Sequence, residues 1–331
     1  MNVRFEGTGE PLGPAGDDAV RPFEVSALDA RGRVIQMGPV LDAMLERHDY
    51  PVPVARLLAE AVVLGVLLGS SLKFDGKFIL QTQTDGAVDM LVVDYRTDGG
   101  LRAYARFDKA AVAKAEAEGH VDPGALLGIG TLAMTVDQGP HMSRYQGIVP
   151  LDGDSLEAVA HTYFRQSEQI PTRIRLAAAE MHVREGDRVR HGWRAGGLLV
   201  QFLPDAPERM RQADLPGGDA PASSPAESFT DEDDAWTEAR SLVDTIQDDE
   251  LTDPSVPVER LLFRLFHERG VRVFHAAEVR DECTCSRERV RGVLASFSAE
   301  EIAESTENGE ISVTCEFCSK KYRFDPAEFT E

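Results

Sequence analysis

Four cysteines gathered near the C-terminus constrain this chain more than any other feature of its sequence. They form two short pairs, Cys283-Thr-Cys285 and Cys315-Glu-Phe-Cys318. Proteins stapled by disulfides spread their cysteines along the chain and usually carry a secretion signal. Residues 1–20 contain no apolar segment of the kind a signal peptide needs, so we expect a disordered tail there. In the reducing cytoplasm that this implies, clustered cysteines indicate metal or redox chemistry.

The spacing within each pair predicts a single tetrahedral metal site. In extended backbone, residues two apart point to the same side, so both cysteines of the first pair can face one ion. The second pair has the spacing of a knuckle at the tip of a hairpin, and each pair would span one edge of the tetrahedron. Thiolate ligands admit zinc or iron, which the spacing does not separate. The predicted ligands are Cys283, Cys285, Cys315 and Cys318.

Such a site can be a purely structural metal site, or its loss of metal can act as a switch. A structural zinc contributes about 10–16 kcal/mol in apparent terms at neutral pH, so losing the metal would unfold a small domain built around it. Oxidation can remove the metal, because the thiolate is the reactive form of cysteine. A disulfide between sequence neighbours closes a very short loop and could not replace the metal, since loop-entropy stabilisation grows with loop length.

Other ionisable residues lie close to the cysteines in the sequence. Five basic side chains would stabilise thiolates by their charge. They are Arg287, Arg289, Arg291, Lys320 and Lys321. His267 and His275 are also near, but with four sulfurs available we interpret them as structural residues rather than ligands.

The part of the chain before residue 206 predicts an α+β domain over residues 21–205. Apolar spacing indicates helices over 41–48, 54–72 and 155–167, the last with Ser155 as its N-cap. Strand character is found over 77–83, 90–95, 101–107, 131–136, 145–150, 173–178 and 198–202. Asp-Gly turns between several of these runs favour antiparallel hairpins. We therefore expect a mostly antiparallel single sheet with flanking helices.

Residues 206–256 differ from their surroundings in composition and charge. Residues 208–253 hold fourteen acidic and three basic side chains, which gives −11 of the chain's net −22. Leu215–Ser228 is too poor in large apolar residues to offset the entropy of ordering. Over 229–251, apolar residues recur at helical spacing, which predicts either a marginal amphipathic helix that needs a docking surface or a solvated linker. They are Trp236, Ala239, Leu242, Val243 and Ile246.

Residues 257–331 are predicted to form a second, small domain that contains the cysteines. A helix is expected over 258–266, and Ser298 with Glu301 matches a capping box that opens another. Strands are expected over 271–274, 311–314 and 321–324.

Neither nucleic acid nor membrane is an expected partner. Binding to phosphate needs a positive surface, whereas the net charge here is −22. The longest apolar stretch, Ala61–Gly69, falls short of the ~20 residues that a membrane-spanning helix requires. We expect a cytoplasmic protein.

Short segments along the chain, in a fixed order, resemble one known family. Those at the cysteines are Cys283-Thr-Cys-Ser-Arg-Glu-Arg289, Gly309-Glu-Ile and Cys315-x-x-Cys318. Those in the first domain are His48-Asp-Tyr-Pro51, Leu72-Lys-Phe-Asp-Gly76, Arg144-Tyr-Gln-Gly147, Gly153-Asp154, Tyr163-Phe164, Ser167-Glu-Gln-x-Pro-Thr-Arg173 and Ala195-Gly-Gly-Leu-Leu199. Together they are similar to the 33 kDa chaperonin family, the redox-regulated bacterial holdases.

The resemblance implies a chaperone that uses no ATP and is not an enzyme. The reduced form, with one zinc ion on the four cysteines, would be an inactive monomer. Under oxidative stress the disulfides Cys283–Cys285 and Cys315–Cys318 would form, zinc would leave, and the small domain and linker would unfold. The exposed apolar surface would capture unfolding client proteins, as a homodimer, before ATP-dependent foldase chaperones receive them.

Two other interpretations compete with this one. The first is a thiol–disulfide oxidoreductase that uses Cys315 and Cys318, although such motifs normally open a helix in a thioredoxin-like context, and here a strand is expected before them. The second is a zinc-ribbon nucleic-acid binder, which the basic clusters 287–291 and 320–323 favour and the acidic remainder opposes.

Overall fold

The first of the two large sheets contains strands from both ends of the chain. The computed structural model describes residues 3–5, 15–72, 75–139, 142, 144–185, 188–204 and 233–329. Within them, the sheet has the order β1-β11-β2-β3-β10-β9, with β12 also on β2. Its strands are β1 (Val3–Phe5), β2 (Ala19–Val25), β3 (Ala30–Met37), β9 (Thr172–Glu185), β10 (Arg188–Phe202), β11 (Val271–Val273) and β12 (Ala277–Glu278). All its pairs except β1–β11 are antiparallel.

The second large sheet is built mostly from the central part of the first half of the chain. Its order is β13-β6-β5-β4-β7-β8, antiparallel except for the short β13. The strands are β4 (Lys77–Thr84), β5 (Val88–Arg96), β6 (Gly100–Phe107), β7 (Ile129–Asp137), β8 (Tyr145–Asp152) and β13 (Arg280–Asp281). The α+β class and the antiparallel character are confirmed. The expected single sheet was wrong, because the unpredicted hairpin β2–β3 pairs with β10 and makes a separate sheet.

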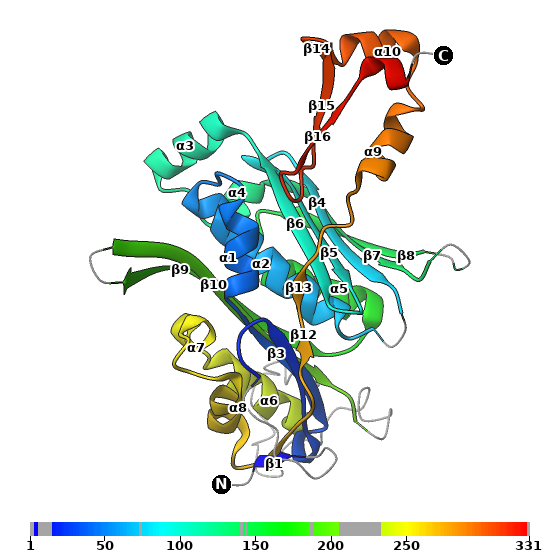
Figure 1. The fold of residues 1–331 in the computed structure, drawn as a ribbon. Helices are drawn as coiled ribbons and strands as arrows, with labels where there is room; N and C mark the ends of the chain where they lie inside the picture. Colours follow the sequence, from blue (N-terminus) through cyan, green and yellow to red (C-terminus); the bar gives the residue numbers. More distant parts are fainter. Residues whose placement is uncertain are drawn as a thin grey trace.

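One apolar helix fills the space between the two sheets (Figure 1). The predicted break at residues 49–51 separates α1 (Pro39–Glu46) from α2 (Val52–Gly69). Helix α2 packs on strands of both sheets, and at Gly65 an added Cβ would lie 2.7 Å from Val93. Within the described residues, α2 alone is long and apolar enough to cross a membrane, but 83% of it is buried inside the protein. It is therefore the central core helix.

Three further helices flank these sheets. They are α3 (Lys109–Glu118), α4 (Pro123–Leu127) and α5 (Leu156–Tyr163). As predicted, Ser155 caps α5 by accepting a hydrogen bond from the backbone N–H of Ala158. The helix predicted to residue 167 continues beyond α5 as one π-helical turn, Phe164–Glu168.

The other face of the first sheet is covered by helices that follow the acidic segment. They are α6 (Asp234–Asp244), α7 (Asp248–Thr252) and α8 (Val258–Phe266). Trp236, Ala239, Val243 and Ile246 are buried in a second apolar cluster with residues of the sheet. The amphipathic interpretation of this segment is thus confirmed from residue 234 onward. Residues 205–232, including the predicted disordered stretch Leu215–Ser228, lie outside the described residues.

The C-terminal region forms a small third sheet with two helices, at the opposite end of the molecule from α6–α8 (Figure 1). Its elements are α9 (Arg287–Leu294), α10 (Ala299–Glu304), β14 (Thr306–Glu307), β15 (Glu310–Thr314) and β16 (Lys321–Phe324). The predicted capping box is present, because Ser298 and Glu301 exchange side-chain and backbone hydrogen bonds.

Two predicted boundaries do not coincide with breaks in packing. The small domain was expected from residue 257, but α8 and β11 pack on the first sheet, because their apolar side chains complete its second cluster. The tail was expected to extend to residue 20, but Asp17 forms a bidentate ion pair with the buried Arg194, and Val3–Phe5 pairs with β11. Residues 1–2 and 6–14 of that tail lie outside the described part of the chain.

Candidate metal centre

The four cysteine sulfurs converge at the junction between the small C-terminal region and the second sheet. All four lie within 4.8 Å of one another. The shortest contacts join the two motifs: Sγ of Cys283 is 3.7 Å from that of Cys315, and Sγ of Cys285 is 3.3 Å from that of Cys318. These distances are too long for disulfide bonds, so all four are free thiols.

This arrangement fits a four-thiolate metal ion. A zinc–sulfur bond of about 2.3 Å places the sulfurs of a tetrahedron about 3.8 Å apart, close to the contacts between the two motifs. Each cysteine is partly exposed, and Cys285 and Cys315 also pack against the small apolar cluster of this region. Small side-chain rotations would bring the four sulfurs to equal spacing.

Each pair is positioned by a short, rigid piece of backbone. Cys283 follows β13, whose parallel pairing with β6 fixes residues 280 and 281 against Gly100 and Leu101. The second pair occupies the turn between β15 and β16. There the backbone N–H of Ser319 donates to the carbonyl of Cys315 at 2.8 Å, and Ser319 takes a positive φ of 56° to close the turn. This is the knuckle that the spacing predicted.

Three of the thiols, those of Cys283, Cys285 and Cys318, differ in acidity. Burial raises the pKa of Cys283 and of Cys318. Burial acts in the same direction on Cys285, but a hydrogen bond donated by the Tyr322 hydroxyl at 3.1 Å and those from the neighbouring thiols outweigh it and lower the pKa of Cys285 to about 7. Cys285 therefore ionises before Cys283 and Cys318.

The knuckle is docked on the second sheet through the side chain between its two cysteines. Phe317 packs edge-on against Tyr104 with ring centroids 4.8 Å apart, and the guanidinium of Arg102 lies 4.0 Å from the Phe317 ring centroid. Behind it, Nε2 of His48 lies 3.2 Å from the Phe317 carbonyl, and the Ser319 hydroxyl donates to the Arg47 carbonyl at 3.2 Å.

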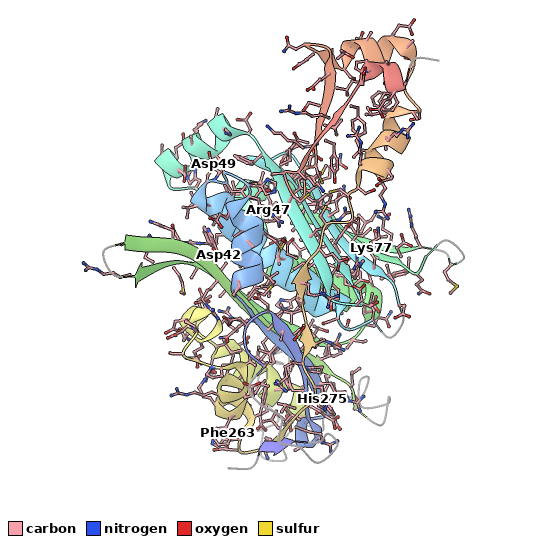
Figure 2. The ribbon with its side chains drawn as sticks, in the orientation of Figure 1. Asp42, Arg47, Asp49, Lys77, Phe263 and His275 are labelled. Atoms are coloured by element: carbon pink, nitrogen blue, oxygen red, sulfur yellow. The ribbon has the colours of Figure 1, made fainter. Side chains whose placement is uncertain are left out.

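Ion pairs also link the two sides of this interface between the cysteine region and the first domain, which is called the seam below. Arg47 at the end of α1 pairs with Asp281 at 2.7 Å, and Figure 2 shows Arg47 where α1 approaches the knuckle. Arg96 pairs with Glu282 at 2.9 Å. The cysteine region and the second sheet are therefore held together by backbone, aromatic and charged contacts.

Comparison with known proteins gives a consistent result over nearly the whole chain. The family model described as Hsp33 protein matches residues 18–325. The 33 kDa chaperonin of Caulobacter vibrioides is 48% identical over 313 residues, which cover 94% of this chain and 95% of that protein. The 33 kDa chaperonin of Pseudomonas syringae pv. tomato is 35% identical over 95% of this chain and 93% of its own length.

The chain belongs to the Hsp33 family. It is accordingly a chaperone, and membership of a chaperone family implies unfolded proteins as its binding partners. The crystal structure of the 33 kDa chaperonin of Thermotoga maritima shares the fold, with a TM-score of 0.70 at 18% identity over 94% of this chain and 96% of that one.

Two of the five basic side chains that were expected to act on the thiols of this Hsp33 chain bind other groups, whereas Nζ of Lys320 lies 5.3 Å from the ring centroid of Tyr322, whose hydroxyl donates to Cys285. Arg287 donates to the Arg323 carbonyl and pairs with Glu328, and Arg289 donates to the Thr284 carbonyl. The charges that act on the thiols come from Arg102, which hydrogen-bonds Cys283, and from Arg47. Both lie in the first domain, so no signal near the cysteines in the sequence points to them.

The two nearby histidines lie away from the sulfurs, as predicted. Figure 2 places His275 at the end of the molecule opposite the small C-terminal region. Nδ1 of His267 lies 3.1 Å from the Phe263 carbonyl, and its ring packs on that of Phe263, which Figure 2 places at the same distant end.

Proposed function

We propose that this chaperone is a redox-regulated, ATP-independent holdase whose reduced, zinc-bound form is inactive. One observation carries the proposal: the four sulfurs meet in a region whose apolar cluster has only five buried side chains in the described structure. A core of that size does not stabilise a domain by burial alone. A zinc ion on the sulfurs would supply the missing stability, on the order of 10–16 kcal/mol. In this proposal Cys283, Cys285, Cys315 and Cys318 are both ligands and redox sensors.

Oxidation removes the ligands by forming two disulfides. In each, two zinc-bound thiolates give two electrons to hydrogen peroxide, a sulfur–sulfur bond forms, the oxygen–oxygen bond breaks, and two protons from solvent complete the two waters that leave. By resemblance to the family, the bonds join Cys283 to Cys285 and Cys315 to Cys318. Such short loops restrain the unfolded chain very little, so the region would unfold.

The sulfur contacts favour a second pairing that must be tested. In the reduced structure Cys283 lies 3.7 Å from Cys315, and Cys285 lies 3.3 Å from Cys318. Disulfides with that pairing would close much longer loops and hold the two motifs together. Peptide mapping by mass spectrometry after peroxide treatment separates the two cases, and disulfides between the motifs would contradict the proposed unfolding.

The surface that would bind clients lies under the acidic helices. Unfolding of the knuckle releases the ion pairs of Asp281 and Glu282 and frees the chain that leads back to α8. Helices α6–α8 cover an apolar face of the first sheet. Its buried side chains include Phe23, Val25, Val34, Leu198, Val200 and Phe202. We propose that residues 206–256 act as the metastable linker whose release exposes this face of the domain 21–205.

The acidic linker is held by arginines of its neighbours. Arg173 pairs with Asp244 at 2.5 Å and Arg175 with Asp248 at 3.1 Å, both from β9. Arg269, beyond α8, pairs with Glu238 at 2.6 Å. Once these pairs separate, mutual repulsion of the linker carboxylates opposes re-docking and keeps the exposed form soluble. In the proposal this form dimerises in the bacterial cytoplasm and later passes clients to ATP-dependent foldases.

Neither competing interpretation is favoured by the site. The Cys315–Cys318 motif occupies a turn between two strands, whereas a catalytic motif of this kind opens a helix. Three of the basic side chains expected to contact nucleic acid pair with carboxylates instead: Arg287 and Arg291 with Glu328, and Arg323 with Glu310.

Paired zinc-release and light-scattering assays test the proposal. The reduced protein should hold one zinc ion and leave a denatured client to aggregate. Peroxide with mild heat should release zinc and suppress aggregation, and a thiol reductant with zinc should reverse both. Equal suppression by reduced and oxidised protein would refute the switch, and turnover of a disulfide substrate with zinc retained would favour an oxidoreductase.

A further inference from the structure

A second group of metal-ligating side chains lies on the hairpin formed by β9 and β10. The hairpin extends past α1 and projects from the body of the molecule (Figure 1). In its register His182 is directly opposite His191, and Glu180 is two residues before His182. Because side chains alternate along a strand and directly opposed residues share a face, all three lie on the same face of the hairpin.

The three side chains converge. Nδ1 of His191 lies 3.3 Å from Oε1 of Glu180, and Nε2 of His182 lies 3.8 Å from the same oxygen. The two imidazole rings are 4.3 Å apart and nearly perpendicular. One ligand atom from each residue lies within 4.8 Å of the others. For zinc bonds of about 2.0–2.2 Å, the nitrogen and oxygen ligands of a tetrahedron are about 3.3–3.5 Å apart, which these side chains already approach.

We propose that Glu180, His182 and His191 form a second metal site, open to solvent, that takes a divalent transition ion such as zinc. Two imidazoles and one carboxylate select zinc, copper or nickel over the oxygen-preferring magnesium and calcium. Three protein ligands leave one position for water, as in zinc sites that exchange their fourth ligand. The proposal is independent of the function assigned to the four cysteines.

The surroundings favour a cation at this place. A cavity of about 290 Å³ beside His191 is lined by Asp42 and Glu46 of α1, and Figure 2 shows Asp42 on the side of α1 that faces the hairpin. Carboxylates around a site raise the local concentration of cations. A plain ion pair between Glu180 and one histidine would contribute little at such exposure.

The site differs from the cysteine centre in its response to oxidants. It contains no sulfur, so peroxide concentrations that convert the cysteines to disulfides leave its ligands unchanged. It is also partly exposed, with His182 and His191 52% and 64% accessible, so the ion would exchange with solvent. The chain would therefore keep one exchangeable ion after its thiolates are oxidised.

Zinc titration of the reduced full-length protein against a chromophoric chelator tests the site. We expect a second, weaker equivalent of zinc beyond the tightly held one. The double variant His182→Ala/His191→Ala should lose this second equivalent alone. Glu180→Gln should weaken it by at least ~10–100-fold, since losing even an outer hydrogen-bond partner of a ligand costs that much. His120→Ala is the matched control, because His120 is an exposed histidine that lies near a single carboxylate, Glu118 at 3.7 Å.

Imidazole NMR signals give a readout that does not depend on the cysteines. Zinc should shift the ring resonances of His182 and His191 and leave those of His120 in place, in both the reduced and the peroxide-treated protein. If the cysteines hold no zinc, these shifts still appear, so the two proposals fail separately. The proposal is overturned if wild-type protein takes up no second equivalent, or if the double variant takes it up unchanged.

Discussion

The two faces of the first sheet are covered in different ways. One face packs on α2, a single helix of 18 residues whose side chains are apolar nearly all round and which also contacts the second sheet. The other face packs on α6, α7 and α8, which have 11, 5 and 9 residues, and α6 and α7 have acidic outer surfaces. Both coverings bury large apolar clusters in the folded protein.

This difference indicates which of the two sets of helices can separate from the first sheet. Helices shorter than about 12–15 residues are marginal without a docking surface, whereas α2 is enclosed between two sheets and cannot leave without unfolding both. The short helices are joined to the knuckle region only through β11, β12 and β13, and they are held along their length by surface ion pairs, which contribute little each. We therefore expect oxidation of the cysteines to undock the acidic helices and to leave the first sheet folded.

The largest expected effect is the loss of amide protection on oxidation. Peroxide treatment should abolish hydrogen-exchange protection over residues 234–252 and 283–329, because in the proposed switch the five-residue apolar cluster would unfold once the cysteines lose their metal. Helix α2 should keep its protection. Exchange measured by mass spectrometry before oxidation, after it and after reduction with zinc checks this, and loss of protection in α2 would remove the proposed contrast between the two faces.

The sequence predicted this contrast only in part. Local signals located the capping box at Ser298 and the helix Val258–Phe266, because caps and apolar spacing act within a few residues. The hairpin β2–β3 was missed, since Pro22 interrupts its first strand and Gly32 its second, and both residues weaken the strand signal. The predicted ligands were brought together as four partly exposed thiols.

The side chains that contact the cysteines could not be predicted from such local signals. Arg102 and Arg47 reach the cysteines from strands and helices far earlier in the chain, and only tertiary packing brings them there. Arg287 and Arg289, which are adjacent to the cysteines in the sequence, bind backbone carbonyls and a carboxylate instead. The docking role of Phe317 likewise depends on Tyr104 across the seam.

The next largest effect should come from removing the aromatic anchor of α6. Trp236 is 4% exposed and packs beside Phe202 on the sheet. Trp236→Ala should destabilise the docked helices by about 3–5 kcal/mol, the usual cost of truncating a buried aromatic side chain. The reduced variant should then suppress aggregation of a denatured client in light scattering without any oxidant.

The chain offers a matched control in its other tryptophan. Trp193 packs at the margin of the cluster around α2, on the opposite face of the sheet. Trp193→Ala should lower the denaturant midpoint without switching on suppression. The comparison of the two faces would fail if both variants became active in the reduced state, or if Trp236→Ala kept full protection in α6.

A smaller effect, a dependence of stability on pH, should arise from Glu60 of α2, whose pKa is influenced by Asp248 of α7. Burial, the charge of Glu157 and, less strongly, that of Asp248 raise the pKa of Glu60 in α2 from 4.5 to about 7. The folded protein therefore keeps this proton over a range in which the unfolded chain has lost it. Stability from this group is complete below about pH 4.5 and is lost as pH rises to about 7. Glu60→Gln should remove this loss and add about 1–3 kcal/mol above pH 7.

Urea unfolding of wild type and Glu60→Gln on both sides of neutral pH measures this difference. Glu116→Gln, an exposed carboxylate on α3, is the control and should leave the pH profile unchanged. Exchange in α7 should also become less sensitive to pH in Glu60→Gln, because Asp248 then faces a neutral side chain. An unchanged pH profile for Glu60→Gln would show that the carboxylate is solvated in solution.

The smallest expected effect concerns the seam itself. Phe317→Ala removes an edge-on ring pair and a cation–π contact, together about 1–2 kcal/mol, without touching any sulfur. The undocking equilibrium should shift by roughly 5–30-fold. The variant should still bind zinc when reduced, but at a fixed peroxide concentration α6 should lose exchange protection sooner than in wild type.

Phe297→Ala provides the matched control for the seam, because Phe297 lies in the same small region but is 39% exposed and, within the described residues, is not one of the side chains that dock on the second sheet. It should activate at the wild-type rate. If Phe317→Ala and Phe297→Ala behave alike, docking through Phe317 does not couple the cysteines to the acidic helices, and the coupling must run through the backbone pairing of β13 with β6 alone. Replacing Tyr104 in the Phe317→Ala background then distinguishes a direct ring contact from a general loosening, since a direct pair makes the two changes non-additive.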